Sequence, residues 1–276
     1  MTTDCWLCGS AAGVDEDLGD LGFVRCAQCG FVFRPASQDE LRDVYEGGAY
    51  QDRDFAAGYA ADDTIDERLH NARVRVGYVQ RFARSGKLLD VGAAGGAFVL
   101  AAGRAGLDAR GIEPSPAFAR HARERLGVDV ADGRLEDADI EPRSLDVITM
   151  WHVLEHVPEP LAALAICMRA LRPGGLLVLE VPNLDSVMYS VMGREWTHLD
   201  PQAHVAQFTG ATLTDALQRA GFTVLATETV AIDAYLSPRE RLAPGHLAYR
   251  AKLLRHGVAR AVDARRHEFL RAVAQA

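Results

Sequence analysis

The segment Lys87-Leu-Leu-Asp-Val-Gly-Ala-Ala-Gly-Gly96 decides the fold class. Its apolar first half predicts a buried strand, and its glycine-rich second half predicts a tight turn before a helix that begins near Phe98. Small residues let the backbone approach a ligand closely, and open α/β sheets bind ligands beyond the carboxyl ends of their strands. The segment therefore predicts a ligand site at this turn.

Downstream of this turn, apolar runs alternate with helical stretches. Thr209 is expected to cap a helix that ends before Gly221. A Pro173-Gly174-Gly175 turn is expected before the strand 176–181. The alternation is typical of a mostly parallel sheet with helices on both faces. The expected strands are 88–91, 109–112, 145–150, 176–181 and 222–232, and the expected helices are 97–105, 117–126, 160–171 and 211–220.

Two acidic residues end the first two expected strands. Asp90 is suited to accept a hydrogen bond from an ammonium group or to organise the backbone around a small zwitterion, and it would repel a phosphate. Glu113 follows at about the twenty-residue interval at which an acidic side chain receives ribose hydroxyls. Together they indicate a ribose-bearing ligand without a 2′-phosphate.

Four of the five cysteines lie within the first thirty residues. Cys5-x-x-Cys8 is followed after seventeen residues by Cys26-x-x-Cys29, which is the spacing of a zinc site. A segment of this length could hardly fold on apolar burial alone, so a zinc ribbon is expected over residues 1–35. Four cysteines leave no open position for water, which makes the zinc structural.

The composition limits the function classes. The chain has 276 residues, 49% of them apolar, with a formal charge of −8. This argues against a surface built to neutralise phosphates, and the basic positions within 250–266 are interpreted as a solvated helix face. No apolar run is long enough for a bilayer, and the first residues do not resemble a signal peptide, so a soluble cytoplasmic protein is expected.

Four regions are expected along the chain. The ribbon (1–35) precedes a helical connector or substrate lid (36–84), the main domain (85–236) and a helical C-terminal extension (237–276). Aromatic residues of the connector could wall a substrate pocket or simply pack in the core, and core packing is the commoner use. They are Tyr45, Tyr50, Phe55, Tyr59 and Tyr78.

The motifs resemble those of class I S-adenosylmethionine-dependent methyltransferases. The resemblance is carried by Leu-Leu-Asp-Val-Gly-x-x-Gly-Gly-x-Phe98, by Glu113, by Ser144-Leu-Asp-Val-Ile-Thr-Met-Trp-His-Val-Leu-Glu-His-Val157 and by Leu171-Arg-Pro-Gly-Gly175. It runs from about residue 86 to residue 232. It implies a Rossmann-like α/β fold and S-adenosylmethionine as the cofactor.

The resemblance also implies the cofactor site. The loop 92–96 would lie against the methionine part, Glu113 would hold the ribose diol, and the turn 133–136 would lie near the adenine. Where many members have an acid after the third strand this chain has Gly133-Arg134-Leu135, so the adenine contact falls to the backbone or to Asp132. Ala94 replaces the usual middle glycine. The implied cofactor residues are Asp90, Gly92, Ala94, Gly96, Phe98, Glu113, Leu135, Trp151 and His152.

Two histidines are candidates for the chemistry. His152, beside Trp151, lies where related enzymes border the reactive methyl, although both residues could instead belong to the core or to a structural network with Glu155 and His156. His204 lies in the segment 196–209, which follows the expected strand 176–181. In related enzymes this part of the fold usually carries inserted substrate-binding elements. Histidine titrates in the range that a general base needs.

The ribbon, the stretch Arg25-Cys-x-x-Cys-Gly-Phe-Val-Phe-x-Pro35 and His204 together are similar to bacterial small-molecule methyltransferases, including sugar C-methyltransferases. In those enzymes a histidine serves as a base near the acceptor, and His204 matches it best. The departures are that the tyrosine and acid beside that histidine are replaced by Gln202 and Ala203, and that the additional C-terminal domain is lacking.

Three functions are weighed. The leading one is methyl transfer to oxygen or carbon of a small molecule in a biosynthetic or tailoring pathway. In the second, the ribbon presents RNA, although its acidic residues disfavour nucleic acid. In the third, a non-catalytic protein uses the ribbon for docking, against which the intact Asp90 and Glu113 argue. A membrane partner is not expected, and monomer and homodimer both remain open.

Overall fold

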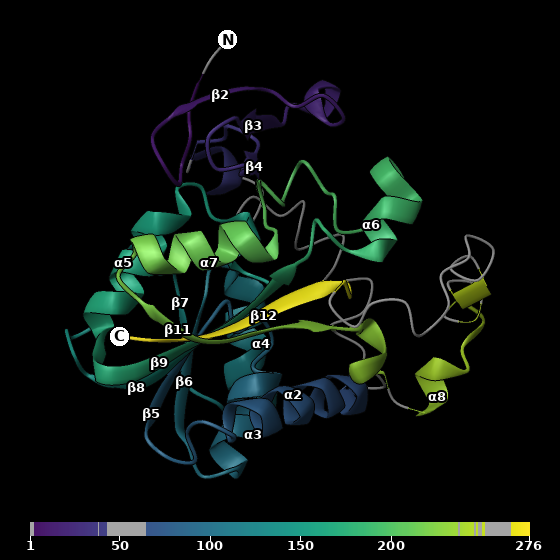
Figure 1. Cartoon of the computed structure of the whole chain (residues 1–276). Helices are drawn as coiled ribbons and strands as arrows, with labels where there is room; N and C mark the ends of the chain where they lie inside the picture. The colour runs from purple at the N-terminus through teal and green to yellow at the C-terminus, as the bar shows by residue number, and fades with distance from the viewer. Residues whose placement is uncertain are drawn as a thin grey trace.

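The computed structural model describes residues 3–37, 39–42, 65–236, 238–245, 247, 250–251 and 266–276. These residues form a seven-stranded sheet flanked by helices and a five-stranded sheet at the N-terminal end (Figure 1). The α/β class predicted from the sequence is confirmed.

The seven-stranded sheet has the order β11-β12-β9-β8-β5-β6-β7. The neighbours from β9 to β7 are parallel, whereas β12 is antiparallel to both β9 and β11. The strand order reverses at β5, so a crevice lies beyond the carboxyl ends of β5 and β8. The strands are β5 (Lys87–Val91), β6 (Asp108–Glu113), β7 (Val130–Asp132), β8 (Leu145–Trp151), β9 (Leu171–Pro182), β11 (Thr223–Val230) and β12 (Phe269–Gln275).

Helices cover both faces of this sheet (Figure 1). Along β5, Leu88 packs in the cluster that contains α2 and α3, and Leu89 packs in the cluster that contains α5 and α7, as the period of two in a strand requires. One face carries α2 (Ile65–Val79), α3 (Ala97–Arg104) and α4 (Pro116–Leu126), and the other carries α5 (Pro160–Ala170) and α7 (Gly210–Arg219). Shorter elements are η1 (Gly19–Leu21), η4 (Leu154–His156), α6 (Val187–Met192), η5 (Gly193–Glu195), η6 (Ile232–Ala234) and α8 (Pro238–Arg241).

The expected boundaries of α7 are confirmed. The side chain of Thr209 accepts from the backbone N–H of Thr212, whose own hydroxyl accepts from the N–H of Thr209, forming a capping box. Gly221 follows the helix with a φ of 95°. The expected turn at 173–175 lies within β9, where the pairing register with β8 shifts.

The C-terminal region corrects a prediction. Residues 237–276 were expected to form a helical extension, but 269–275 form β12, which lies inside the main sheet. Alanine favours helices, yet Ala272 and Ala274 are buried on one face of the sheet and Val273 on the other, and this burial outweighs local propensity. The main domain therefore includes the end of the chain. Much of the basic region 250–266 lies outside the described residues.

The connector is helical where the structure describes it. α2 buries Val76, Tyr78 and Val79 against α3 and the sheet, so Tyr78 is a core residue. The other four aromatic residues named for a pocket wall lie in 43–64, outside the described residues. Their predicted role stays a prediction.

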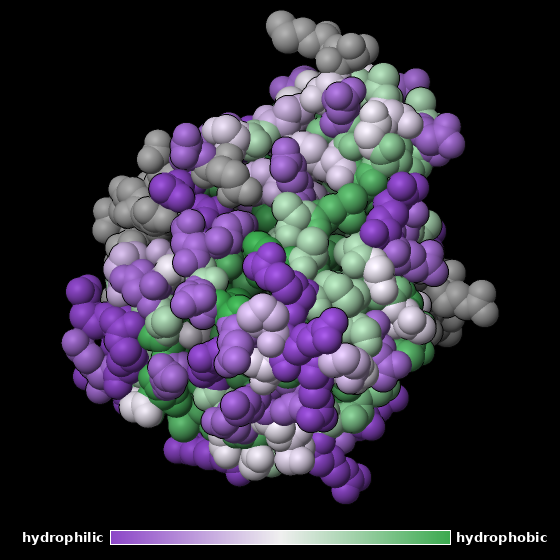
Figure 2. Space-filling model, turned by 90° about the vertical axis from the view of Figure 1, so that its left-hand side faces the viewer, coloured by the Kyte–Doolittle hydropathy of each residue, from purple (hydrophilic) through white to green (hydrophobic). Residues whose placement is uncertain are grey.

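The five-stranded sheet joins the ribbon to the main domain. Its order is β1-β2-β3-β4-β10, and β10 comes from the segment that follows His204. Figure 2 shows this junction from the side, with apolar residues gathered between the ribbon at the top and the main domain below. The strands are β1 (Thr3–Asp4), β2 (Ala11–Val14), β3 (Val24–Cys26), β4 (Val32–Phe33) and β10 (Ala206–Gln207).

Within the described residues, no helix combines the length and the apolar character that crossing a bilayer requires.

Candidate active site

A cavity of about 540 Å³ opens beyond the carboxyl ends of β5, β6 and β8. Six of the nine predicted cofactor residues line it, and both predicted catalytic histidines do so as well. Cavities of this size hold cofactors and small substrates. The predicted residues at the cavity are Gly92, Ala94, Glu113, Leu135, Trp151, His152 and His204.

The glycine-rich loop is fastened to Glu113. The backbone N–H of Ala94 donates to Glu113 Oε2 at 2.8 Å, and the N–H of Ser115 donates to Glu113 Oε1 at 2.9 Å. Gly92 has a φ of 70°, and a Cβ there would come within 2.6 Å of the side chain of Val153. The loop can therefore take this close course only with glycine at position 92.

Glu113 is placed to accept hydrogen bonds from hydroxyl groups. It is buried at the end of β6 and lines the cavity. Burial raises the pKa of its carboxyl to about 7, against the opposing effect of the Ser115 and Ala94 N–H donors. Hydrogen bonds from a ribose diol would favour the ionised form.

Asp90 lies beneath the loop and is not part of the cavity lining. It is 2% exposed and accepts a hydrogen bond at 2.6 Å from the hydroxyl of Thr149 on β8. Burial raises its pKa to about 7. This geometry suits the second role that the sequence allowed, organising the backbone, better than direct contact with a ligand ammonium.

Another part of the cavity wall is formed by the turn after β7. Gly133, Arg134, Leu135 and Glu136 line it, whereas Asp132 does not. Arg134 and Glu136 approach each other at 3.7 Å. The backbone of this turn and the apolar surface of Leu135 are thus the groups available to a flat ring such as adenine.

Gly96 and Phe98 support the site from behind. A Cβ at Gly96 would lie 2.7 Å from Val128 and 2.8 Å from Ala122, so glycine allows the loop to pack against α4. The ring of Phe98 lies 5.3 Å from that of Trp151. Neither residue lines the cavity.

Trp151 carries an unused donor. Its indole Nε1 is buried and has no hydrogen-bond partner among the described residues. The same is true of Nε of Arg75, whose guanidinium carbon lies 5.1 Å from the centre of the Trp151 ring. Buried donors without partners are rare in folded proteins, so this end of the cavity is chemically suited to a polar ligand.

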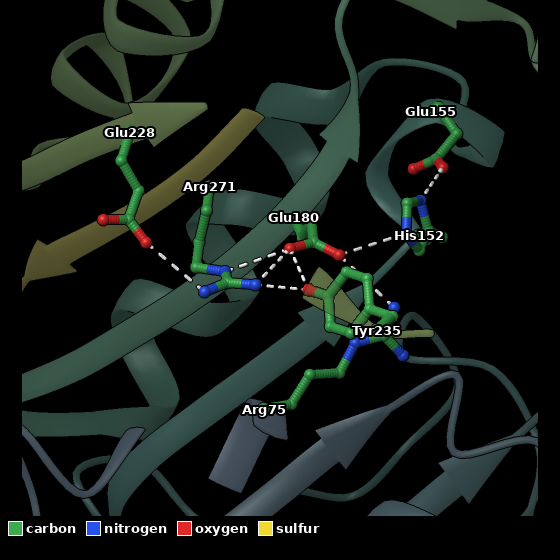
Figure 3. A network of polar contacts seen from close by, with 7 residues as sticks. All are labelled: Arg75, His152, Glu155, Glu180, Glu228, Tyr235 and Arg271. Atoms are coloured by element: carbon green, nitrogen blue, oxygen red, sulfur yellow. Dashed lines mark hydrogen bonds and ion pairs between the residues drawn. The ribbon is translucent and has the colours of Figure 1, made fainter. Parts of the chain in front are cut away.

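His152 lies between two carboxylates. It has a φ of 57°, and its Nδ1 lies 3.3 Å from Glu155 Oε1 while its Nε2 lies 3.2 Å from Glu180 Oε1 (Figure 3). Burial opposes the charge, but the two carboxylates prevail and raise the pKa of His152. A carboxylate beside each ring nitrogen favours the protonated ring, which has no lone pair, so the arrangement suits orienting a ligand better than accepting a proton.

Glu180 is the centre of this network (Figure 3). Its side chain is fully buried on β9 and accepts from Arg271 Nη2 at 2.7 Å, from Arg75 Nη2 at 3.3 Å and from the Tyr235 hydroxyl. Burial alone would raise the pKa of Glu180, but His152 and the two arginines lower it below the ordinary range. The network thus joins α2, β8, β9, β12 and η6 behind the cavity.

His204 is bound to the backbone through one ring nitrogen. Its Nδ1 lies 2.6 Å from the carbonyl oxygen of His198. A carbonyl can only accept, so Nδ1 carries the hydrogen, and in the neutral ring Nε2 carries the lone pair. His204 lines the cavity, which is the arrangement a general base requires.

Sequence reasoning did not single out His198. Its ring lines the cavity and stacks nearly parallel to the rings of His152 and His204, at centroid distances of 6.4 and 6.5 Å. Burial and the neighbouring His152 lower its pKa to about 4. Its position between the two predicted histidines could be found only from the fold.

Among the described residues, two groups of side chains could hold a cation. The ligand atoms of Glu155, His156 and His204 lie within 4.8 Å of one another at the cavity. The four cysteines Cys5, Cys8, Cys26 and Cys29 form the second group in the ribbon.

The cysteine geometry fits zinc. Cys5 Sγ lies 3.6 Å from Cys29 Sγ, and Cys8 Sγ lies 3.4 Å from Cys26 Sγ. Tetrahedral zinc with sulfur about 2.3 Å away places its ligand sulfurs about 3.8 Å apart. Each knuckle is closed by a backbone hydrogen bond, from Gly9 to Cys5 and from Gly30 to Cys26. Zinc bound there would hold the two knuckles together.

A family model described as a methyltransferase domain matches residues 63–227, which is more than half of the chain. The chain belongs to this methyltransferase family. The seven-stranded sheet, with its single antiparallel strand between β9 and β11, is accordingly that of the class I S-adenosylmethionine-dependent methyltransferases.

Relatives with curated names match a shorter part of this methyltransferase. A ubiquinone biosynthesis O-methyltransferase of Methylococcus capsulatus is 35% identical over 118 residues, which are 40% of this chain and 50% of that protein. The one of Xanthomonas campestris is 36% identical over 133 residues, 45% of this chain and 56% of that protein. The chain spans about half the length of the curated relatives it matches.

Solved structures share the fold. A methyltransferase of Thermotoga maritima, described as a possible histamine N-methyltransferase, superposes with a TM-score of 0.57 and 20% identity over 83% of this chain and 99% of its own. A second one, from Archaeoglobus fulgidus, has a TM-score of 0.55 and 18% identity over 76% of this chain and 94% of its own. At such identities the likeness concerns the fold alone.

The affinity of this methyltransferase for S-adenosylhomocysteine should depend on pH. Because burial raises the pKa of Glu113 to about 7, binding that requires its carboxylate must expel a proton at lower pH. We expect the affinity to fall by roughly tenfold per pH unit below pH 7. Isothermal titration calorimetry between pH 5.5 and 8.5 measures it.

The control for this prediction is Glu113→Gln. This variant should bind more weakly and lose most of the pH dependence. A slope that persists in Glu113→Gln would contradict the assignment and transfer the titration to Asp90, whose pKa is raised similarly.

Proposed function

We propose that this methyltransferase transfers the methyl group of S-adenosylmethionine to a hydroxyl oxygen of a small molecule. The observation that carries the proposal is one cavity that runs from the Gly92 loop and Glu113 to His204. The cofactor would occupy the first part, with Glu113 on its ribose and the turn 133–136 beside its adenine. The acceptor would lie near His204.

The chemistry needs little beyond alignment and removal of one proton. The acceptor oxygen attacks the methyl carbon of the sulfonium, the bond from carbon to sulfur breaks, and the hydroxyl proton passes to His204 Nε2. Holding the two reactants in line supplies most of the rate enhancement. His152, whose pKa is raised by two carboxylates, would orient the reactants without taking the proton.

Two further observations support a small acceptor at oxygen. The similar curated proteins are named O-methyltransferases. The ribbon exposes acidic residues such as Glu16 and Asp17, and Asp20 pairs with Arg194, so a surface for RNA backbone is not favoured there.

Carbon is the second candidate for the accepting atom. His204 would serve an acidic carbon as well as a hydroxyl, and its resemblance to the histidine of sugar C-methyltransferases favours that reading. Mass spectrometry and NMR of the methylated product separate the two outcomes.

His204→Ala should slow turnover by about 10²-fold or more, the usual contribution of a general base. The affinity for S-adenosylhomocysteine should stay unchanged, because the cofactor end of the cavity is untouched. Release of S-adenosylhomocysteine with a panel of catechols, phenols and sugar nucleotides measures turnover. Gln202→Ala, at an exposed position of the same segment, is the matched control. Turnover equal to that of Gln202→Ala would remove His204 from the mechanism.

A further inference from the structure

The zinc ribbon and the acceptor end of the cavity share one segment of chain. Residues 196–208 carry His198 and His204 on the cavity side, and the same segment forms β10 of the ribbon sheet. The pairing of β10 with β4 is antiparallel, with Ala206 opposite Phe33 and Gln207 opposite Val32. The segment is therefore built into both units.

Arg34 fastens this segment from the ribbon side. Its backbone N–H donates to the carbonyl of Val205 at 2.8 Å, and its Nε donates to the carbonyl of Pro201 at 2.5 Å. One arginine thus holds the chain on both sides of His204. Its guanidinium also pairs with Glu40 at 2.8 Å, and its side chain is 16% exposed.

Apolar contacts hold the remainder of the segment. Trp196 and Leu199, on either side of His198, are buried in one cluster with ribbon residues Leu18 and Phe23. At the far end, Phe208 packs against Phe31, with ring centroids 5.4 Å apart. The ribbon therefore contacts the segment near its start, in its middle and at its end.

The position of the segment decides how His204 faces the cavity. Its Nδ1 hydrogen is held by the carbonyl of His198, which lies within the same braced segment. A histidine in water favours the other neutral tautomer, with the hydrogen on Nε2. A segment released from the ribbon would no longer hold His198 and His204 in this geometry, and loss of the hydrogen bond would allow the tautomer in which Nε2 carries the hydrogen and not the lone pair.

We propose that the zinc ribbon is the positioning element of the acceptor end, acting through Arg34 on the segment 196–208. Arg34 is a positioning residue, because it touches the chain around His204 and does not line the cavity. The consequence for turnover rests on the proposed function of His204. The effect of the ribbon on the position of the segment does not rest on that role. The positioning proposal and the proposed role of His204 can therefore fail separately.

The test compares Arg34→Gln with Arg25→Gln. Arg25 is also a ribbon arginine, but its partners, Asp15 and Gly30, lie within the ribbon. Zinc content and affinity for S-adenosylhomocysteine are measured first and should equal those of the native protein in both variants. Amide hydrogen exchange and the tautomers of ¹⁵N-labelled histidines are then recorded without any acceptor.

We expect Arg34→Gln to raise exchange across 196–208 and to move His204 toward the Nε2–H tautomer, with exchange at 87–113 unchanged. Arg34→Lys, which keeps a donor, should restore part of both signals, and Arg25→Gln should match the native protein. Turnover with the acceptor panel should fall in Arg34→Gln without a change in KM for S-adenosylmethionine. A zinc-loaded Arg34→Gln protein with native exchange and native tautomer at His204 would overturn the proposal, whatever its activity.

Discussion

Glu180→Ala should lower the free energy of unfolding by about 3–5 kcal/mol, the usual loss when one partner of a buried charge network is removed. Its side chain is fully buried, and Arg75, Arg271 and His152 all direct charge at it. Without the carboxylate, Arg75 would lose its only ion pair among the described residues, while Arg271 would keep only that with Glu228 and His152 only that with Glu155. Urea unfolding followed by circular dichroism measures the loss.

Glu228→Ala is the matched control for this prediction. Glu228 also pairs with Arg271, at 3.3 Å, but its side chain is 40% exposed. Exposed ion pairs contribute about 0–1 kcal/mol, so its loss should be small. If Glu180→Ala lowered the free energy of unfolding by as little as Glu228→Ala does, the network would not stabilise the fold.

The same network predicts acid sensitivity. The pKa of Glu180 is lowered in the folded protein, because the cations around it outweigh the effect of burial. A lowered pKa stabilises the fold above the unfolded value and loses that stabilisation as the pH falls. The difference in stability between the native protein and Glu180→Ala should therefore shrink as the pH falls below about 4.

Removal of zinc should unfold the ribbon. Structural zinc contributes about 10–16 kcal/mol of apparent binding energy in small zinc modules at neutral pH. The largest buried rings of the ribbon, Phe23, Phe31 and Phe33, lie in apolar clusters that also contain main-domain residues, so the ribbon has little apolar core of its own. We expect one zinc per chain in the native protein and close to none in Cys26→Ser, measured by elemental analysis of the purified protein.

Cys167→Ala is the control for the zinc prediction. Cys167 is the fifth cysteine, buried in α5 and outside the zinc group. This variant should keep one zinc, and hydrogen exchange at 3–33 should equal that of the native protein, whereas Cys26→Ser should exchange rapidly there. A Cys26→Ser protein with full zinc content and native protection would contradict the assignment.

The sequence predicted the parts of the fold that depend on local pattern. The apolar run before Gly92, the helix cap at Thr209 and the paired cysteines each have a short-range physical cause, and the structure places them as expected. β12 was missed because its residues favour a helix locally, and they become a strand only by insertion between β9 and β11. No feature of the local sequence indicates that residues 269–275 lie between β9 and β11.

The charge network behind the cavity was also missed. Arg75, Glu180 and Arg271 each stand as a charged residue within an apolar stretch, and that was a usable signal, because a buried charge needs a partner. The identity of the partners depends on the strand order, which places β12 beside β9. His198 was overlooked for the same reason, because its stacking between His152 and His204 depends on the course of a loop.

The central claim is that the cavity at Gly92 and Glu113 binds S-adenosylmethionine. Native mass spectrometry of the zinc-loaded protein with added S-adenosylhomocysteine tests it most directly, because zinc and cofactor appear in one spectrum. The account predicts one zinc and one nucleoside per chain, with the nucleoside weakened in Glu113→Gln. A protein that holds zinc but binds neither S-adenosylhomocysteine nor S-adenosylmethionine at high concentration would contradict it.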